Sequence, residues 1–120
     1  MADQIRIKRV YEAPADADGR RILVDRLWPR GLSKPKAALA AWIKAVAPSD
    51  DLRHWFGHDP QRWPEFQLRY AAELDANAAA VAELRALLRQ GPATLVYAAH
   101  DEAHNNALAL AGYLERLQAS

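Results

Sequence analysis

Apolar and polar residues alternate along this chain in the two periods that distinguish strands from helices. In residues 5–10 the period is two, with Ile5 and Ile7 on one face and Arg6 and Lys8 on the other, which predicts a short strand. Residues 21–25 and 94–98 have continuously apolar centres, which is typical of strands covered on both faces of a sheet. The pattern therefore predicts three strands, two of them buried.

Helical periodicity dominates the second half of the chain. Residues 60–74 place Trp63, Phe66, Tyr70 and Leu74 on one face, which predicts a helix that buries these side chains in the core. A further helix is expected from residue 77 to residue 88, where a Gly-Pro pair at 91–92 provides the stop signal. A final helix is expected after Asp101, which would cap it. Its predicted buried stripe is Ala107, Leu110, Ala111, Leu114 and Leu117.

The segment 33–48 fits either helix or strand. Its alanine content favours a helix, and Leu39, Trp42, Ile43 and Val46 fit a helical stripe. Both assignments stay open for residues 39–46. Ser49 then predicts the N-cap of a short helix that ends near residue 57.

Helices placed between central strands predict an α/β fold, here a small single domain over residues 1–120. Its sheet should be short, mainly parallel and flanked by helices. Strands 22–24 and 95–97 are expected to be adjacent and parallel, because two buried apolar runs have few other ways to satisfy their backbone groups. Their carboxyl ends would then lie on one edge of the sheet, where α/β proteins bind ligands.

The loop after the strand at 21–25 carries the first candidate site. It reads Asp25-Arg26-Leu27-Trp28-Pro29-Arg30-Gly31, in which Trp-Pro stiffens the chain and Gly31 is free to take a positive φ. From Arg26 to Lys36 there are four cations and no acid. Asp25, Arg26, Trp28 and Arg30 are therefore candidate ligand-binding residues. The alternative is that the two arginines pair with structural carboxylates and that Trp28 covers the core.

The second candidate cluster follows the strand at 94–98. Asp101 and Asn105 are candidate ligand-binding residues near a helix start, where unpaired N–H groups favour anions. Tyr97 or His104 would handle a proton if the site is catalytic. The alternative is that Asp101 only caps the helix and that His104 and Asn105 are solvated.

Composition excludes several chemistries. The chain has 120 residues, no cysteine and a net charge of +1, so it has no thiol chemistry and no global charge suited to nucleic acid. Its histidines lack a metal-binding motif, so no metal and no cofactor are predicted. With no membrane span and no export signal, the expected location is the cytoplasm.

The residues also match a known family. The chain resembles the YeaO-like branch of the family named as domain of unknown function 488, over nearly its whole length. The resemblance rests on residues 8–11 and 21–31, on Trp42, 47–49, 52–53, 55–56, Phe66, Tyr70 and Leu74, and on 95–99, 101–102 and 104–107. It implies a small α/β domain in a cytoplasmic bacterial protein, and that Arg26, Trp28, Arg30, Tyr97 and the pair His104-Asn105 belong to the family's motifs. It implies no substrate.

The chain departs from the wider family after its last strand. Tyr97 and Asn105 stand where that group often carries cysteines, and Asn106 replaces its histidine. A Cys-His mechanism therefore does not carry over. His100 stands where the YeaO-like branch tends to have Lys or Arg.

Three functions remain open at this point. The first is an enzyme or sensor that binds a small phosphorylated or carboxylated ligand through Arg26 and Arg30. The second is a nucleic-acid-associated accessory protein whose loop 26–36 contacts phosphates while Trp28 stacks on a base. The third is a protein-interaction module without chemistry. The sequence does not define the oligomeric state.

Overall fold

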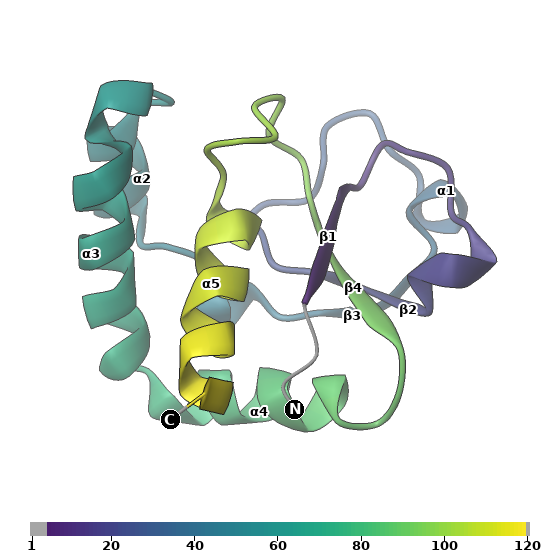
Figure 1. The fold of residues 1–120 in the computed structure, drawn as a ribbon. Coiled ribbons are helices and arrows are strands. Elements are labelled where there is room, and N and C mark those ends of the chain that lie inside the picture. The colour runs from purple at the N-terminus through teal and green to yellow at the C-terminus, as the bar shows by residue number, and fades with distance from the viewer. Residues whose placement is uncertain (1–4, 120) are drawn as a thin grey trace.

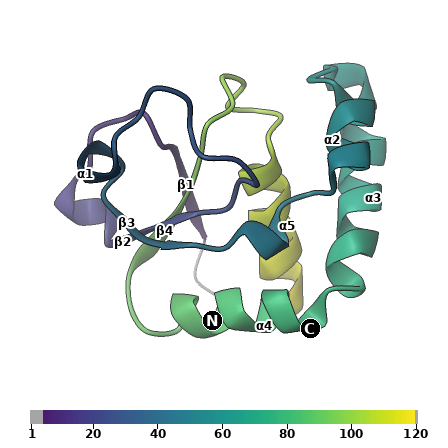
Figure 2. The ribbon, with the colours of Figure 1, turned by 180° about the vertical axis from the view of Figure 1, so that it is seen from behind.

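A computed structural model describes residues 5–119, which form a parallel sheet flanked by helices (Figures 1 and 2). The strands are β1 (Arg6–Arg9), β2 (Arg20–Leu23), β3 (Leu39–Trp42) and β4 (Ala93–Tyr97), in the spatial order β1-β4-β2-β3. The helices are α1 (Lys34–Ala37), α2 (Asp50–Phe56), α3 (Trp63–Asp75), α4 (Ala78–Leu88) and α5 (Asn106–Ala119). The predicted α/β class is confirmed.

The two buried strands are neighbours, as predicted. β2 pairs with β4 in parallel, with Ile22 opposite Leu95 and Leu23 opposite Val96. β1 pairs with the other side of β4, also in parallel. The carboxyl ends of β1, β2 and β4 consequently lie on one edge of the sheet.

Side chains from alternate strand positions enter two apolar layers. Ile22, Val24 and Leu95 face the larger layer, which packs against α2, α3, α4 and α5. Leu23 and Val96 face a smaller layer beneath α1 and the loop after β2, where Trp28 and Trp42 also pack. In Figure 1, α3 descends on the left, α4 crosses the bottom, and the loop after β4 rises at the top before entering α5. Figure 2 shows α1 at the opposite end of the molecule from α2 and α3.

A buried ion pair supports the smaller layer from the side. Asp18 accepts hydrogen bonds from Arg21 at 3.0 Å and from Lys8 at 3.1 Å, and the Arg21 side chain is only 2% exposed. Burial raises the pKa of the Asp18 carboxyl, but hydrogen bonds from the Ala15 N–H, Lys8 and Arg21 outweigh it, so the pKa lies below its ordinary value of 3.8.

The ambiguous segment 33–48 contains a strand. Ser33 caps the one-turn helix α1, and Ala38 ends it in a left-handed conformation with φ of 50°. β3 then pairs with the edge of β2, and a single 3-10 turn follows at Lys44–Val46. Only α1 is α-helical in this segment, so the helical alternative for residues 39–46 is wrong. The edge of β2 offers hydrogen-bond partners to the backbone of residues 39–42, and this pairing favours the strand.

The other helices follow the sequence prediction with two differences. Ser49 caps α2, and Gly57 closes it at φ of 53°. The segment 60–74 divides into a 3-10 turn at Pro60–Arg62 and then α3, in which Phe66, Tyr70 and Leu74 are buried and Trp63 is only partly so. α5 begins at Asn106, five residues after Asp101.

Among the helices of residues 5–119, none is long and apolar enough to cross a membrane.

Candidate functional site

A cavity of about 640 Å³ lies at the carboxyl ends of the strands. We call it the carboxyl-edge cavity. The loop after β2, the loop after β4 and the start of α5 supply most of its wall, and α2 and α3 contribute Arg53, Phe56 and Phe66. Of the eight candidate site residues, seven line this cavity: Asp25, Arg26, Trp28, Arg30, Asp101, His104 and Asn105. The predicted convergence of the two loops on one place is therefore present in the fold.

The two arginines of the first loop differ in their surroundings. Arg26 donates from Nε and one terminal nitrogen to the Pro48 carbonyl at 3.4 and 3.3 Å, and it lies 3.7 Å from Asp50. Among residues 5–119, the exposed Arg30 guanidinium has no hydrogen-bond or ion-pair partner. Its backbone is held instead, because the Tyr11 hydroxyl donates to the Arg30 carbonyl at 2.9 Å. Arg30 thus presents a free cation from a fixed loop.

Trp28 holds that loop against the smaller apolar layer. Its indole N–H donates to the Leu32 carbonyl at 2.7 Å, and its ring meets Trp42 edge-on with a centroid distance of 5.5 Å. Gly31, next in the chain after Arg30, has a φ of 76°, as its position in the loop predicted. The indole N–H is used internally, so Trp28 offers the cavity only ring surface.

Asp25 joins the three elements that meet at the cavity. One carboxylate oxygen accepts from the Ala98 N–H after β4 at 2.9 Å, and the other accepts from the Asn106 side chain of α5 at 2.9 Å. Burial raises the pKa of this carboxyl, and the hydrogen bonds from Asn106 and Ala98 partly oppose that effect. The Asp25 carbonyl also accepts from the Trp42 indole. Each oxygen therefore has a structural partner before any ligand is considered.

Asp101 and His104 form a pair on the cavity wall. Asp101 accepts from His104 Nδ1 at 2.9 Å and from the Ala103 and His104 N–H groups. The hydrogen bond from His104 is the main reason that the pKa of Asp101 lies below its ordinary value. The His104 ring meets Trp63 edge-on at 5.4 Å. Both side chains are oriented by neighbours.

The cap of α5 is Asn105, which corrects the prediction for Asp101. Asn105 Oδ1 accepts from the Leu108 N–H at 2.8 Å, while its Nδ2 donates to the Asp101 and Glu102 carbonyls. Asp101 closes only the turn before the helix. Aspartate and asparagine are both good caps, so residue type does not distinguish them. The polar atoms of the buried Asn105 are all engaged internally.

Tyr97 lies outside the cavity wall. Its side chain is 2% exposed and packs in the larger apolar layer. Burial raises the pKa of its hydroxyl above the ordinary value. The structure thus brings His104, but not Tyr97, to the cavity.

Several further lining residues were not among the sequence candidates. Tyr11 follows β1, Arg53 and Phe56 belong to α2, and His58 follows that helix with a φ of 58°. Only the tertiary fold brings Arg53, Phe56 and His58 to the cavity, whereas Tyr11 follows β1, whose carboxyl end lies on the same edge of the sheet. Residues 5–119 contain no cluster of three His, Asp or Glu side chains arranged to hold a metal ion.

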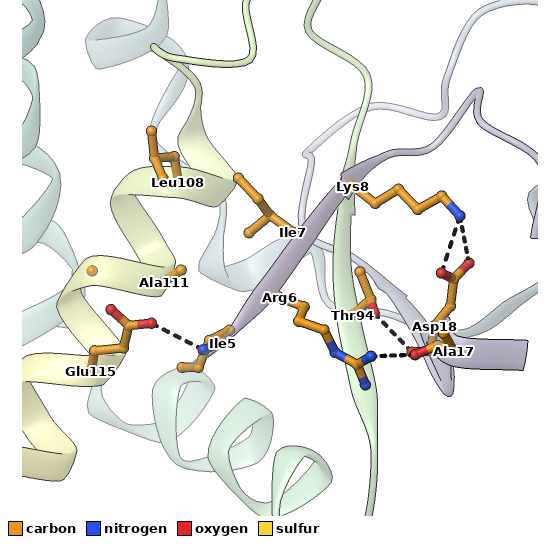
Figure 3. Close-up of a pocket in the computed structure, with 11 residues that line it drawn as sticks. Ile5, Arg6, Ile7, Lys8, Ala17, Asp18, Thr94, Leu108, Ala111 and Glu115 are labelled. Atoms are coloured by element: carbon orange, nitrogen blue, oxygen red, sulfur yellow. Dashed lines mark hydrogen bonds and ion pairs between the residues drawn. The ribbon is translucent and has the colours of Figure 1, made fainter. Parts of the chain in front are cut away.

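A second cavity of about 560 Å³ lies between β1 and α5 (Figure 3). Its charged groups are already paired within the cavity. Lys8 binds Asp18, Arg6 donates to the Ala17 carbonyl, and Glu115 accepts from the Ile5 N–H at 2.9 Å. Each of these charged side chains already has a hydrogen-bond partner, whereas Arg30 in the carboxyl-edge cavity has none among the described residues, so the carboxyl-edge cavity is the stronger candidate site.

The fold is that of a small α/β protein with a cavity at the carboxyl ends of its parallel strands. The chain belongs to the domain of unknown function 488 family: the model described as "Inactive DUF488-N3 subclade" matches residues 4–120. It is 44% identical to Rv3073c of Mycobacterium tuberculosis over 111 residues, which cover 92% of this chain and 93% of that protein. It is 41% identical to YeaO of Escherichia coli over 113 residues, covering 94% of this chain and 98% of that protein. No solved structure matches the chain.

Proposed function

We propose that this chain binds a small anionic ligand, a phosphate or a carboxylate, in the carboxyl-edge cavity. The observation that carries the proposal is the Arg30 guanidinium, which lines the cavity and lacks a partner among the described residues. Arg26 and Arg53 line the same cavity, against the two carboxylates of Asp25 and Asp101. Arg26 and Arg53 already face the Asp50 carboxylate, at 3.7 and 3.1 Å, so Arg30 is the arginine of this lining that has no such partner. A guanidinium can grip a carboxylate or phosphate with two parallel hydrogen bonds.

We further propose that the ligand is bound without being converted, as in a sensor. The matching family model is described as that of an inactive subclade. The surroundings of Tyr97 and His104, the two residues predicted to transfer a proton, agree with that description. Tyr97 is buried outside the cavity, and His104 is paired with Asp101 and next to no serine, threonine or cysteine on the cavity wall.

Thermal stability in the presence of anions tests the proposal. A ligand that binds only the folded state raises the melting temperature. Phosphate or acetate should therefore stabilise the wild type more than chloride does at the same ionic strength. Arg30→Ala should remove most of this stabilisation, because a charge-assisted hydrogen bond contributes roughly 1.5–3 kcal/mol. Arg30→Lys should recover part of it, since lysine restores the charge but not the planar fork.

The matched control is Arg89→Ala. Arg89 is an exposed cation at the end of α4 and does not line the cavity. The control variant should keep the full response to phosphate. An equal loss in both variants, or no specific response in the wild type, would refute the anion site. Stabilisation by single-stranded DNA without any response to phosphate would favour the nucleic-acid alternative instead.

A further inference from the structure

The carboxyl-edge cavity combines its cations with a large apolar surface. Phe56 and Phe66 line it and stack on each other with a centroid distance of 4.4 Å. Trp28 and Pro29 add further apolar surface from the loop that carries Arg30. Phe56 and Phe66 are only 6% and 2% exposed, so a bare inorganic anion at the guanidinium would leave uncovered mainly the apolar surface of the Trp28 loop.

Two large apolar side chains of the cavity lining are well exposed. Leu27 is 59% exposed and Tyr11 is 40% exposed, and both line the cavity. Large apolar side chains with such exposure are rare in the described chain, and Leu27 directly precedes the Trp-Pro-Arg segment. Exposed apolar surface beside a pocket is a common feature of ligand-binding sites.

From these features we infer that the ligand is an organic acid with an aromatic body. This inference rests on the proposed function and extends it. The acid group binds at Arg30, and the ring lies against the Leu27 and Trp28 side chains, which line the cavity and keep exposed surface. The volume of about 640 Å³ lies within the range of small-molecule pockets, so it holds a ring together with its acid group.

Calorimetric titration with matched ligands tests the inference. Phenyl phosphate is compared with inorganic phosphate, and benzoate with acetate, so that each pair differs by the ring. Burial of part of the ring should make each aryl acid bind about tenfold tighter than its small partner. Its binding should also show the more negative heat-capacity change that marks apolar burial.

Two leucine variants locate the ring. Leu27→Ser should weaken phenyl phosphate binding about threefold, because the ring loses one partial apolar contact. The affinity for inorganic phosphate should not change. Leu68→Ser is the control, because Leu68 is 69% exposed on α3 and lies outside the cavity. It should change neither ligand's affinity.

The outcomes separate the two proposals. If phosphate binding depends on Arg30 but phenyl phosphate binds no tighter, the inference of an aromatic ligand is wrong and the proposed anion site is still supported. If the two leucine variants have the same effect on phenyl phosphate, the ring lies elsewhere and the inference fails. If neither small anions nor aryl acids bind, both proposals fall.

Discussion

Arg26 and Arg30 show how one loop can contain a structural and a free guanidinium four positions apart. Arg26 joins its loop to the Pro48 carbonyl and Asp50, and Arg30 has no such contact within residues 5–119. From the sequence alone, the two arginines cannot be distinguished, because both are cations in the same stiff loop. The structure gives Arg26 the internal contacts of a structural residue, and ligand binding by Arg30 stays a prediction.

The two arginines should therefore differ in their effect on stability. Arg26→Ala should lower the free energy of unfolding by about 1 kcal/mol, because it removes a hydrogen bond to a carbonyl and a partly exposed ion pair. Arg30→Ala should change it by less than about 0.5 kcal/mol. Urea unfolding of both variants without added anions measures the difference. A larger loss for Arg30 would show that its guanidinium is structural.

Asp18 should make stability sensitive to acid. Its pKa is lowered in the folded protein, so its contribution is complete above about pH 3.8 and is lost as the pH falls through the lower, folded value. Asp18→Asn should destabilise the protein by about 3–5 kcal/mol at pH 7, because Arg21 is then buried without its charge partner. Urea unfolding at several pH values should show this difference shrinking below about pH 4. A difference that is constant down to pH 3 would contradict the assigned role.

At the scale of elements, helix α3 is the best test of core packing. Phe66 is 2% exposed, so Phe66→Ala should cost roughly 3–5 kcal/mol through lost burial and the cavity left behind. Leu68→Ala, on the exposed face of the same helix, should cost less than about 1 kcal/mol. Chemical denaturation compares the two. Similar losses would mean that the helix faces are not those described.

The start of β2 depends on a close backbone approach at Gly19. A Cβ there would lie 2.3 Å from the Pro92 carbonyl oxygen, and φ is 61°. Gly31 also has a positive φ, of 76°, but a Cβ would meet nothing within 4 Å. Gly19→Ala should thus destabilise the protein far more than Gly31→Ala, for which backbone strain of about 1 kcal/mol is expected. Thermal unfolding ranks the two variants, and equal losses would be inconsistent with the close approach.

The elements also show what the sequence could specify. β2, β4 and α3 have apolar patterns that fit one period, and the structure confirms them. Residues 39–46 fit both the helical and the strand period. Which of the two forms depends on pairing with β2, a contact between segments distant in the sequence. Arg30 and Trp28 could be predicted to lie at the cavity because they follow a strand. Arg53 could not, because only the packing of α2 brings it to the same cavity.

At the scale of the whole molecule, the parallel sheet determines where the site lies. Asp25 after β2 binds the Ala98 N–H after β4 and the Asn106 side chain at the start of α5. These contacts fix three segments around one cavity. The second cavity lies between β1 and α5, and its charged side chains already have hydrogen-bond partners (Figure 3). We therefore expect an anion to bind in the carboxyl-edge cavity and not in the second cavity.

An NMR titration of the labelled protein with inorganic phosphate tests the anion site most directly, because it detects weak binding and locates it. We predict saturable shifts of the Arg30 side-chain N–H and of backbone amides in residues 26–31 and 98–106, which Arg30→Ala abolishes and Arg89→Ala retains. Shifts confined to residues around the second cavity, or a response that persists in Arg30→Ala, would contradict the account.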